Sequence, residues 1–320
     1  MPLFLKKLNQ IDEKKWENLV LTSKYSSFYH TLFWAGIWEK PFPFCEALFF
    51  VLEEQNYLAG LPLIRFKKKG LLSFFSMPFG TYGGIIGNLS EEQKIQFLRQ
   101  VVKFGTEKKH LRLQIVDFFG QNKELEKLDF KKTPTFTHLI NLDNSKSEIG
   151  FQKRGYEQSL KKELSIREVD SLDDVKICYQ LYLATALKHQ LKQIKYPLKF
   201  YENLFLSGAN SNHLKWWIVS KEKQIMAYQI NFVCKDTLYY WDGASWPDFL
   251  HDRPNDALMG HSLKWAKENN LKFYNLGGSP EKAEGLIKFK EDWGGETKNY
   301  FIYEKTTALG KIQNIVRTFL

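Results

Sequence analysis

The stretch that decides the fold runs from Leu238 to Gly295 and reads LYYWDGASWPDFLHDRPNDALMGHSLKWAKENNLKFYNLGGSPEKAEGLIKFKEDWGG. It opens with an aromatic strand that ends at Asp242-Gly243. A loop with two prolines leads into an amphipathic helix, and a short strand, Phe273–Leu276, then runs into Gly277-Gly278-Ser279. Strand, helix and strand in this order predict an α/β domain with helices packed on a sheet.

The same pattern occurs twice. The segments FFVLEE (Phe49–Glu54) and WIVSKE (Trp217–Glu222) align without a gap, and the same offset matches Tyr57–Ala59 to Ile225–Ala227. Repeats this long indicate duplicated domains, since the repeats of solenoids are shorter. Each copy predicts three strands, a helix and a fourth strand: Ala47–Leu52, Tyr57–Phe66, Leu71–Ser76, a helix from the capping box at Ser90 to about Lys109, and Leu111–Val116 in the first; Leu214–Ser220, Gln224–Val233, Leu238–Ala244, a helix over Asn255–Asn269, and Phe273–Leu276 in the second.

The segment between the copies predicts a linker and the start of a second domain. We expect a basic helix over Phe151–Lys162, a strand over Ser165–Val169, and helices over Leu172–His189 and Leu198–Leu206. A short helix is expected after Tyr303. The predicted domains are residues 1–142 and residues 143–320, with the active site in the second.

Composition narrows the class of protein. A chain of 320 residues with a net charge of +10 predicts about two domains and favours an anionic partner, such as a nucleic acid, a nucleotide sugar, a coenzyme or a membrane surface, although solubility alone explains such a charge equally well. The three cysteines are far apart, which excludes a zinc ribbon and a disulfide framework and favours a reducing cytoplasm. No apolar run is long enough for a membrane helix, and no metal-ligand cluster is visible.

Four motifs give the chain a resemblance to a known family. Gly285-Leu-Ile-Lys-Phe-Lys290 with Gly294 matches G-L-x-x-F-K-x-x-x-G, which is the most specific of them. The others are Phe28–Trp34, the basic pairs Lys153-Arg154 and Lys161-Lys162, and Tyr196-Pro197 with Phe200-Tyr201. Together these motifs resemble the FemAB family of tandem acetyltransferase-like (GNAT-type) domains, over most of the chain.

The resemblance implies a fold and an activity. The fold is two tandem GNAT-like α/β (α+β) domains with mixed, mostly antiparallel sheets flanked by helices. The activity is transfer of an aminoacyl group from aminoacyl-tRNA, or of an acyl group from acyl-CoA or a carrier thioester, to an amine of a cell-envelope or surface-glycan precursor. Implied partners are charged tRNA and an anionic nucleotide sugar or cell-wall precursor, with no tightly bound cofactor and no metal, in the cytoplasm including the inner membrane surface.

The phosphate-binding loop of ordinary GNAT enzymes is missing from both copies. That loop, Gln/Arg-x-x-Gly-x-Gly/Ala, offers backbone N–H groups to a pyrophosphate at a helix N-terminus. The second copy has Trp246–Asn255 there, with acidic residues and prolines. The absence weakens an acetyl-CoA donor, and it fits either a tRNA donor or a non-catalytic tandem-GNAT module that binds nucleic acid or glycan.

Two residues are candidates for the chemistry. The resemblance places the pair Phe289-Lys290 at the site, where the Lys290 cation stabilises the oxyanion; the alternative is a solvated lysine on a basic helix. Asp242 ends the third strand of the second copy, where a carboxylate accepts a proton from the attacking amine; the alternative is a turn carboxylate.

Six further residues are candidates for substrate binding. Tyr240 is expected to share a strand face with Asp242, as a core or a site residue. Arg253 and Asn255 stand at the start of the long helix, where they suit anion capture, unless Asn255 or Asp256 only caps the helix. The remaining candidates are Phe289, Ser279 and Arg154, of which Arg154 is either a phosphate ligand or part of a solvated face.

Overall fold

The protein is described by a computed structural model that covers residues 2–79, 81–107, 109–143, 153–188, 194–209, 211–280 and 282–312, without the side chains of residues 153 and 154. Two compact units divide it: Met1–Thr135 with Asn299–Leu320, and Phe136–Lys298. A single boundary near Leu142 does not reproduce these units, because residues 299–320 belong to the first unit. The domain boundary at Leu142 stays a prediction.

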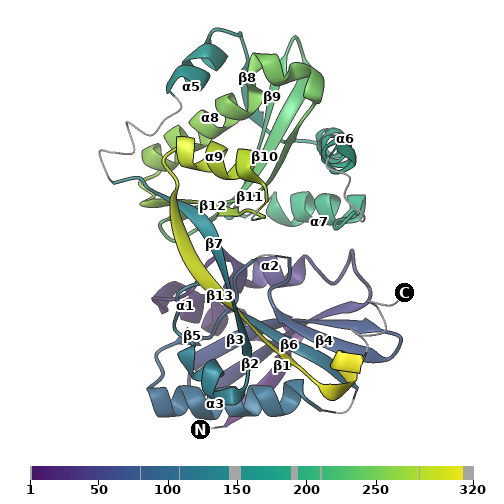
Figure 1. Cartoon of the computed structure of the whole chain (residues 1–320), viewed down its shortest axis with the longest axis vertical. Coiled ribbons are helices and arrows are strands. Elements are labelled where there is room, and N and C mark those ends of the chain that lie inside the picture. Colours follow the sequence, from purple (N-terminus) through teal and green to yellow (C-terminus); the bar gives the residue numbers. More distant parts are fainter. Residues whose placement is uncertain are drawn as a thin grey trace. The chain divides into compact units, whose positions relative to one another are not determined.

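The first unit has a mixed sheet with helices on both faces (Figure 1). Its strands lie in the order β1-β2-β3-β4-β6-β13, with β4 and β6 parallel and the other pairs antiparallel. The elements are β1 (Leu3–Lys7), α1 (Glu13–Thr22), α2 (Leu32–Gly36), β2 (Cys45–Glu53), β3 (Tyr57–Lys68), β4 (Leu71–Ser76), β5 (Ile86–Gly87), α3 (Glu91–Gly105), β6 (His110–Asp117), and part of β7 (Lys131–Asn141) and of β13 (Glu296–Thr306).

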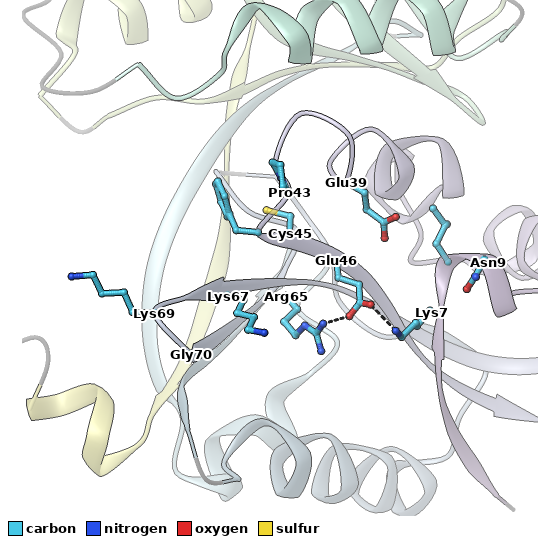
Figure 2. Close-up of a pocket in the computed structure, with 12 residues that line it drawn as sticks. Lys7, Asn9, Glu39, Pro43, Cys45, Glu46, Arg65, Lys67, Lys69 and Gly70 are labelled. Atoms are coloured by element: carbon cyan, nitrogen blue, oxygen red, sulfur yellow. Dashed lines mark ion pairs between the residues drawn. The ribbon is translucent and has the colours of Figure 1, made fainter.

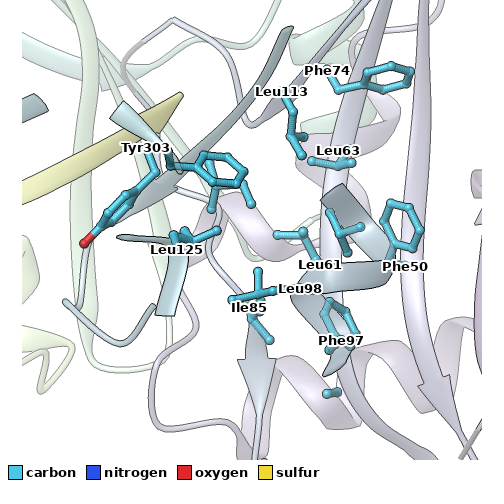
Figure 3. Packing of buried hydrophobic residues seen from close by; sticks show 14 of the residues in the cluster. Phe50, Leu61, Leu63, Phe74, Ile85, Phe97, Leu98, Leu113, Leu125 and Tyr303 are labelled. Atoms are coloured by element: carbon cyan, nitrogen blue, oxygen red, sulfur yellow. The ribbon is translucent and has the colours of Figure 1, made fainter. Parts of the chain in front are cut away.

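The core of the first unit lies between α3 and the sheet. Figure 3 shows Phe97 and Leu98 of α3 against Leu61 and Leu63 of β3. The capping box at Ser90 starts α3 as predicted: the Ser90 hydroxyl accepts from the Gln93 N–H, and the Gln93 side chain accepts from the Ser90 N–H. The buried indole of Trp16 in α1 covers the opposite face, where a Cβ on Gly60 would lie 2.5 Å from it.

The second unit repeats the arrangement. Its strands lie in the order β7-β12-β11-β10-β9-β8, with β11 and β12 parallel and the rest antiparallel. Figure 1 shows α8 and α9 over one face of this sheet and α6 and α7 over the other. The elements are α5 (Lys153–Leu160), β8 (Ser165–Glu168), α6 (Leu172–Lys188), α7 (Leu198–Gly208), β9 (Leu214–Lys221), β10 (Gln224–Cys234), β11 (Thr237–Ser245), α8 (Pro254–Glu268), β12 (Phe273–Gly278) and α9 (Glu284–Asp292).

Both copies therefore follow one plan: three antiparallel strands, a helix, and a fourth strand parallel to the third. A parallel pair needs a crossover connection, which α3 and α8 provide. This confirms the predicted fold class of tandem α/β units. Four of the described strands were not predicted, namely β1, β5, β7 and β13. The helix expected after Tyr303 begins later than predicted, because β13 continues to Thr306.

Candidate functional site

The central strands of the second unit pair over a short length only. The parallel pairing of β11 with β12 covers Thr237 to Tyr239 against Phe273 to Asn275. At Gly277 the strands are still close, since a Cβ there would lie 3.2 Å from the carbonyl oxygen of Tyr240. Beyond this point β11 continues to Ser245, and no described strand pairs with it on that side. The site residues lie where this pairing ends.

A β-bulge at Trp241 decides which way the site residues face. The ladder between β10 and β11 pairs Ile230 with Asp242 but Asn231 with Tyr240, so Trp241 is an extra residue. Tyr240 packs against the hydrophobic cluster under α8 and α9, which includes Met259 and Leu263. The Asp242 carboxylate instead accepts a hydrogen bond from Tyr201 of α7. The expectation that Tyr240 and Asp242 share a face is wrong, because the bulge breaks the alternation of side chains.

Asp242 lies in an aromatic environment on the α6 and α7 side of the sheet. Its Oδ2 atom accepts hydrogen bonds from the Tyr201 hydroxyl at 2.7 Å and the Tyr228 hydroxyl at 2.5 Å. Removal of the carboxylate from water raises its pKa, and the two tyrosine hydrogen bonds oppose this shift only in part. The rings of Tyr196 and Trp241 (centroids 5.1 Å apart) extend the aromatic wall. Asp242 is thus a carboxylate adapted to hold a proton.

Lys290 is buried at the end of β12, with 4% of its surface exposed. Its ammonium group donates hydrogen bonds of 2.9 Å to the carbonyl oxygens of Gly277 and Gly278. Burial lowers the pKa of Lys290 to about 7. The alternative of a solvated lysine is therefore wrong. An ammonium group has three hydrogens, and two of them are used by the carbonyls.

Asn275 shapes the backbone that Lys290 binds. Its Oδ1 atom accepts from the Thr137 hydroxyl at 2.7 Å and from the Gly277 N–H at 2.9 Å. The register of β12 against β7 shifts between Asn275 and Gly278, and Gly277 has a φ of +74°, which favours glycine. The side chain of Asn275 thus holds the irregular strand end whose carbonyls accept from Lys290.

His138 of β7 lies on the same face as Lys290. Because side chains alternate along a strand, His138 lies on the same face of β7 as Ile140, which packs in one cluster with Trp293, the C-cap residue of α9. A Cβ on Gly295 would lie 2.7 Å from the Lys290 carbonyl oxygen and 3.0 Å from the His138 Cβ. Within the described residues, neither ring nitrogen of His138 nor the Ser279 hydroxyl has a hydrogen-bond partner. Burial and the nearby Lys290 cation lower the pKa of His138.

The other predicted substrate-binding residues lie at the start of α8, in the cluster under α8 and α9, and in α5. Arg253 pairs with Asp256 at 3.4 Å, and Asn255 donates to the Ser245 hydroxyl at 3.1 Å. The N-cap of α8 is Arg253 itself in a left-handed conformation (φ 57°), so the alternative that Asn255 or Asp256 is the cap is wrong. Phe289 packs in the cluster under α8 and α9. The backbone of Arg154 lies in α5, and its side chain is outside the described part of the chain.

The structure groups these residues into two sets rather than one. Lys290, Phe289 and Tyr240 belong to the α8 and α9 side, and Asp242 belongs to the α6 and α7 side; no hydrogen bond or ion pair joins Lys290 to Asp242 among the described residues. The sequence prediction missed the two tyrosines that bind Asp242. One signal was present for Tyr201, which ends the Tyr196-to-Tyr201 motif.

The described residues form neither a membrane-spanning helix nor a metal centre. None of the helices has both the length and the apolar character needed to cross a membrane. No group of three or more His, Cys, Asp or Glu side chains in this part of the chain is arranged to hold a metal ion.

Comparison with known proteins places this geometry in a family. Residues 149–291 match the family model of the acetyltransferase (GNAT) domain. The crystal structure of FemX superposes with a TM-score of 0.76 at 14% identity, covering 98% of this chain and 100% of that one. The chain has the tandem GNAT fold. Its second unit is a GNAT acyltransferase domain.

Other solved structures share the fold. The C-terminal domain of a putative lysylphosphatidylglycerol synthetase from Agrobacterium fabrum has a TM-score of 0.63 at 13% identity, with 95% of each chain covered. A tandem GNAT protein from the clavulanic acid biosynthesis pathway has a TM-score of 0.58 at 9% identity, covering 95% of this chain and 98% of that one. No protein of curated function matches the sequence.

Proposed function

We propose that the protein transfers an aminoacyl group to an amine, with Asp242 as the proton acceptor. The observation that carries the proposal is a carboxylate with a raised pKa, bound by two tyrosine hydroxyls, on the central strand of a GNAT domain. A general base works best when its pKa is close to the working pH, and burial among aromatic rings moves a carboxyl group in that direction.

The acceptor amine approaches from the α6 and α7 side. An ammonium group is favoured by a carboxylate and by the faces of aromatic rings, and the environment of Asp242 offers both. After the amine loses its proton to Asp242, its nitrogen attacks the ester carbonyl carbon. A C–N bond forms, the ester C–O bond breaks, and the leaving hydroxyl takes up a proton.

Lys290 acts on the other side of the diverging strands. The described residues supply two acceptors for its three hydrogens, so the third remains for the carbonyl oxygen of the donor, where negative charge develops. Two backbone carbonyls hold the ammonium in place. Because such a group is oriented before the reaction, it stabilises the transition state without reorganisation.

The start of α8 supports aminoacyl-tRNA over acyl-CoA as the donor. Pro254 has no N–H to offer, and the half-turn that follows carries Asp256, whose pKa burial raises. A carboxylate and a missing donor weaken a pyrophosphate site at this helix end. One structure of the same fold is named as a putative lysylphosphatidylglycerol synthetase, which supports an aminoacyl group as the group that is transferred.

The proposal is tested by mass spectrometry of reaction mixtures. The purified protein is incubated with charged tRNA or with acetyl-CoA and with a panel of amino sugars and cell-wall peptides. We expect amide products from charged tRNA, lost in Asp242→Asn and kept in Asp248→Asn, whose side chain is an exposed carboxylate nearby. Products from acetyl-CoA alone would show that the donor is an acyl-CoA and not charged tRNA. Equal activity of the two variants would show that Asp242 has no role in the reaction.

A further inference from the structure

Four polar side chains form a hydrogen-bond network inside the second unit. They come from three elements: Gln229 and Asn231 from β10, Ser262 from α8 and Tyr274 from β12. None has more than 3% of its surface exposed. Apolar groups of the same shape would stabilise such a core as well or better, so stability alone does not explain the network.

The hydroxyl groups of the network have defined donors and acceptors. The Ser262 hydroxyl donates to the Leu258 carbonyl oxygen at 2.8 Å, so it accepts from Gln229 Nε2 at 2.9 Å. The Tyr274 hydroxyl donates to Asn231 Oδ1 at 2.8 Å and therefore accepts from Gln229 Nε2. Gln229 Nε2 also lies 3.1 Å from Asn231 Oδ1. Because each hydroxyl has one hydrogen, these bonds fix β10 against α8 and β12 in one position.

Surface ion pairs do not fix strands in this way. On the first unit, Glu46 of β2 contacts Lys7 of β1 at 3.0 Å and Arg65 of β3, as the dashed lines in Figure 2 show. The side chains of these three residues are 21% to 58% exposed, so water competes with each contact. The buried network of the second unit has no water to replace its bonds, and a shift of β10 would break them all.

The network lies on the face of β10 opposite Asp242. Gln229 and Asn231 flank Ile230, which pairs with Asp242, and their side chains point to the α8 side, where Ser262 is bonded. If β11 had no extra residue while Tyr240 kept its pairing with Asn231, Asp242 would pair with Gln229. Its carboxylate would then face α8. The bulge therefore decides the face of the carboxylate, and the network holds the strand opposite the bulge.

Gly243 shows that β11 is also adapted to the bulge. A Cβ there would clash with the Tyr240 hydroxyl oxygen and lie 3.0 Å from the Tyr228 carbonyl oxygen. The Tyr240 side chain thus lies over Gly243, on one face of the strand. In a regular strand residues 240 and 243 face opposite sides, so this contact exists only because of the bulge.

We propose that the network positions Asp242: it holds the bulge at Trp241, and the bulge keeps the carboxylate on the α6 and α7 side. The positioning residues are Gln229, Asn231 and Tyr274. Among the described residues, no hydrogen bond joins them to the Asp242 carboxylate, so they act through the backbone of β10 and β11. The inference rests on the proposed role of Asp242 as the base.

An apolar replacement of the network tests this role in the full chain. The variant is Gln229→Met/Asn231→Leu/Tyr274→Phe, in which the Ser262 hydroxyl keeps its bond to the Leu258 carbonyl oxygen. We expect a melting temperature at or above that of the wild type, because no buried partner is left unpaired. We also expect kcat to fall about 100-fold, which is the effect of a displacement of about 1 Å at the site. Retained stability with lost turnover separates positioning from a loss of the fold.

A single substitution tests the network without changing the volume of the core. Tyr274→Phe removes only the hydroxyl that donates to Asn231 Oδ1. Tyr303→Phe is the matched control, because it removes an equally buried hydroxyl of the first unit, bonded to Glu126 at 3.2 Å. We expect kcat to fall about fivefold in Tyr274→Phe, as for one lost hydrogen bond, with KM unchanged, and no effect in the control.

A fluorine label reports the position of Asp242 without any assay of turnover. 3-Fluorotyrosine in place of Tyr228 puts the label on a ring whose hydroxyl donates to Asp242 Oδ2. The fluorine NMR signal of Asp242→Asn serves as the reference for loss of the charged acceptor. We expect the signal of the apolar variant, and to a smaller extent that of Tyr274→Phe, to move towards this reference. Tyr303→Phe should leave it in place.

The two readouts separate this inference from the proposed function. An unshifted fluorine signal in the apolar variant, or in Tyr274→Phe if the apolar variant does not fold, overturns the positioning role whatever the turnover. A signal that moves equally in Tyr303→Phe overturns it as well. A shifted signal with wild-type kcat would confirm the positioning role and contradict the proposed role of Asp242 as the base.

Discussion

Single residues of the site differ in how their charge is compensated. Asp242 accepts two hydroxyl hydrogen bonds and still has a raised pKa, because the removal of the carboxylate from water outweighs these bonds and the charge of Lys195. Its activity as a base therefore depends on pH. We expect the rate of the wild-type enzyme to fall as the pH drops through the Asp242 pKa, and the residual rate of Asp242→Asn to be flat over that range. Rate profiles of both proteins measure this; identical profiles contradict it.

The same shift predicts a change in stability. Since the folded pKa of Asp242 lies above the unfolded value of 3.8, the folded state binds the proton more tightly, and this stabilisation is lost as the pH rises through the folded pKa. Asp242→Asn keeps an acceptor for both tyrosines without the charge. We expect its melting temperature, relative to the wild type, to increase between pH 4 and pH 8. Calorimetry across this range gives the result, and a constant difference would mean that the tyrosines compensate the charge fully.

The buried Lys290 also makes stability depend on pH, but its pKa is lowered by burial whereas that of Asp242 is raised. Its pKa is 10.5 in the unfolded chain and about 7 when folded, so at neutral pH the unfolded state binds the proton more readily and the lysine lowers stability. Lys290→Met is expected to raise the free energy of unfolding at pH 7, with a gain that shrinks towards pH 10. Denaturant titrations at several pH values measure the gain. No gain at pH 7 would show that the Gly277 and Gly278 carbonyls fully replace water around the ammonium.

Turnover separates the chemical role of Lys290 from its structural one. Loss of one oriented donor reduces kcat by about 100-fold or more, which is the effect we expect for Lys290→Ala. Lys282→Ala is the control, because that lysine is exposed and lies outside the motif. A raised KM with unchanged kcat would place Lys290 in binding only.

At the scale of elements, the end of β12 is the part most dependent on one side chain. Asn275 is buried and accepts two hydrogen bonds, so Asn275→Ala leaves the Gly277 N–H and the Thr137 hydroxyl without this acceptor. We expect a loss of about 1–3 kcal/mol of unfolding free energy, which is the cost of removing an acceptor from one buried hydrogen-bonding group. Thr137→Val removes only one of the donors and is expected to cost less. Equal losses of unfolding free energy in urea titrations would show that the end of β12 does not depend on the hydrogen bond from the Gly277 N–H to Asn275.

Elements with regular patterns were predictable from sequence, and irregular ones were not. The eight strands and two helices of the repeat follow from dense apolar runs and a capping box, and they were found within a few residues. Strand β7 was missed because its first half, Lys131–Thr135, is polar and contains Pro134, which does not indicate a strand. The bulge at Trp241 has no sequence signature, since an aromatic run looks the same with or without an extra residue.

The candidate site was predictable in type and not in geometry. Lys290 and Asp242 are identifiable because a motif and a strand end draw attention to them. Their burial, and their places on opposite faces, depend on the bulge and on the carbonyls of Gly277 and Gly278. His138 belongs to β7, which was not predicted, and Tyr228 belongs to a strand with an ordinary pattern, so only the folded chain brings them to the site.

For the whole molecule, the division into units predicts which fragments fold. A fragment that starts at residue 143 lacks residues 136–141 of β7, which pair with β12, and leaves that strand with an open edge. We expect residues 136–298 to give a monomer with a cooperative melt, and residues 143–320 to aggregate or melt broadly. Size-exclusion chromatography and thermal melts compare the two. The reverse result would favour the boundary near Leu142.

The return of β13 to the first unit has a consequence for synthesis. A ribosome releases the chain from its N-terminus, and domains usually fold in that order. Here β6 waits for Phe301–Thr306, its neighbour in the sheet, until residues 136–298 have been translated. The second unit is therefore complete before the first, whose residues 1–135 stay without this strand while the second unit is made. A chaperone that holds nascent segments would find its longest-lived target in the residues made first.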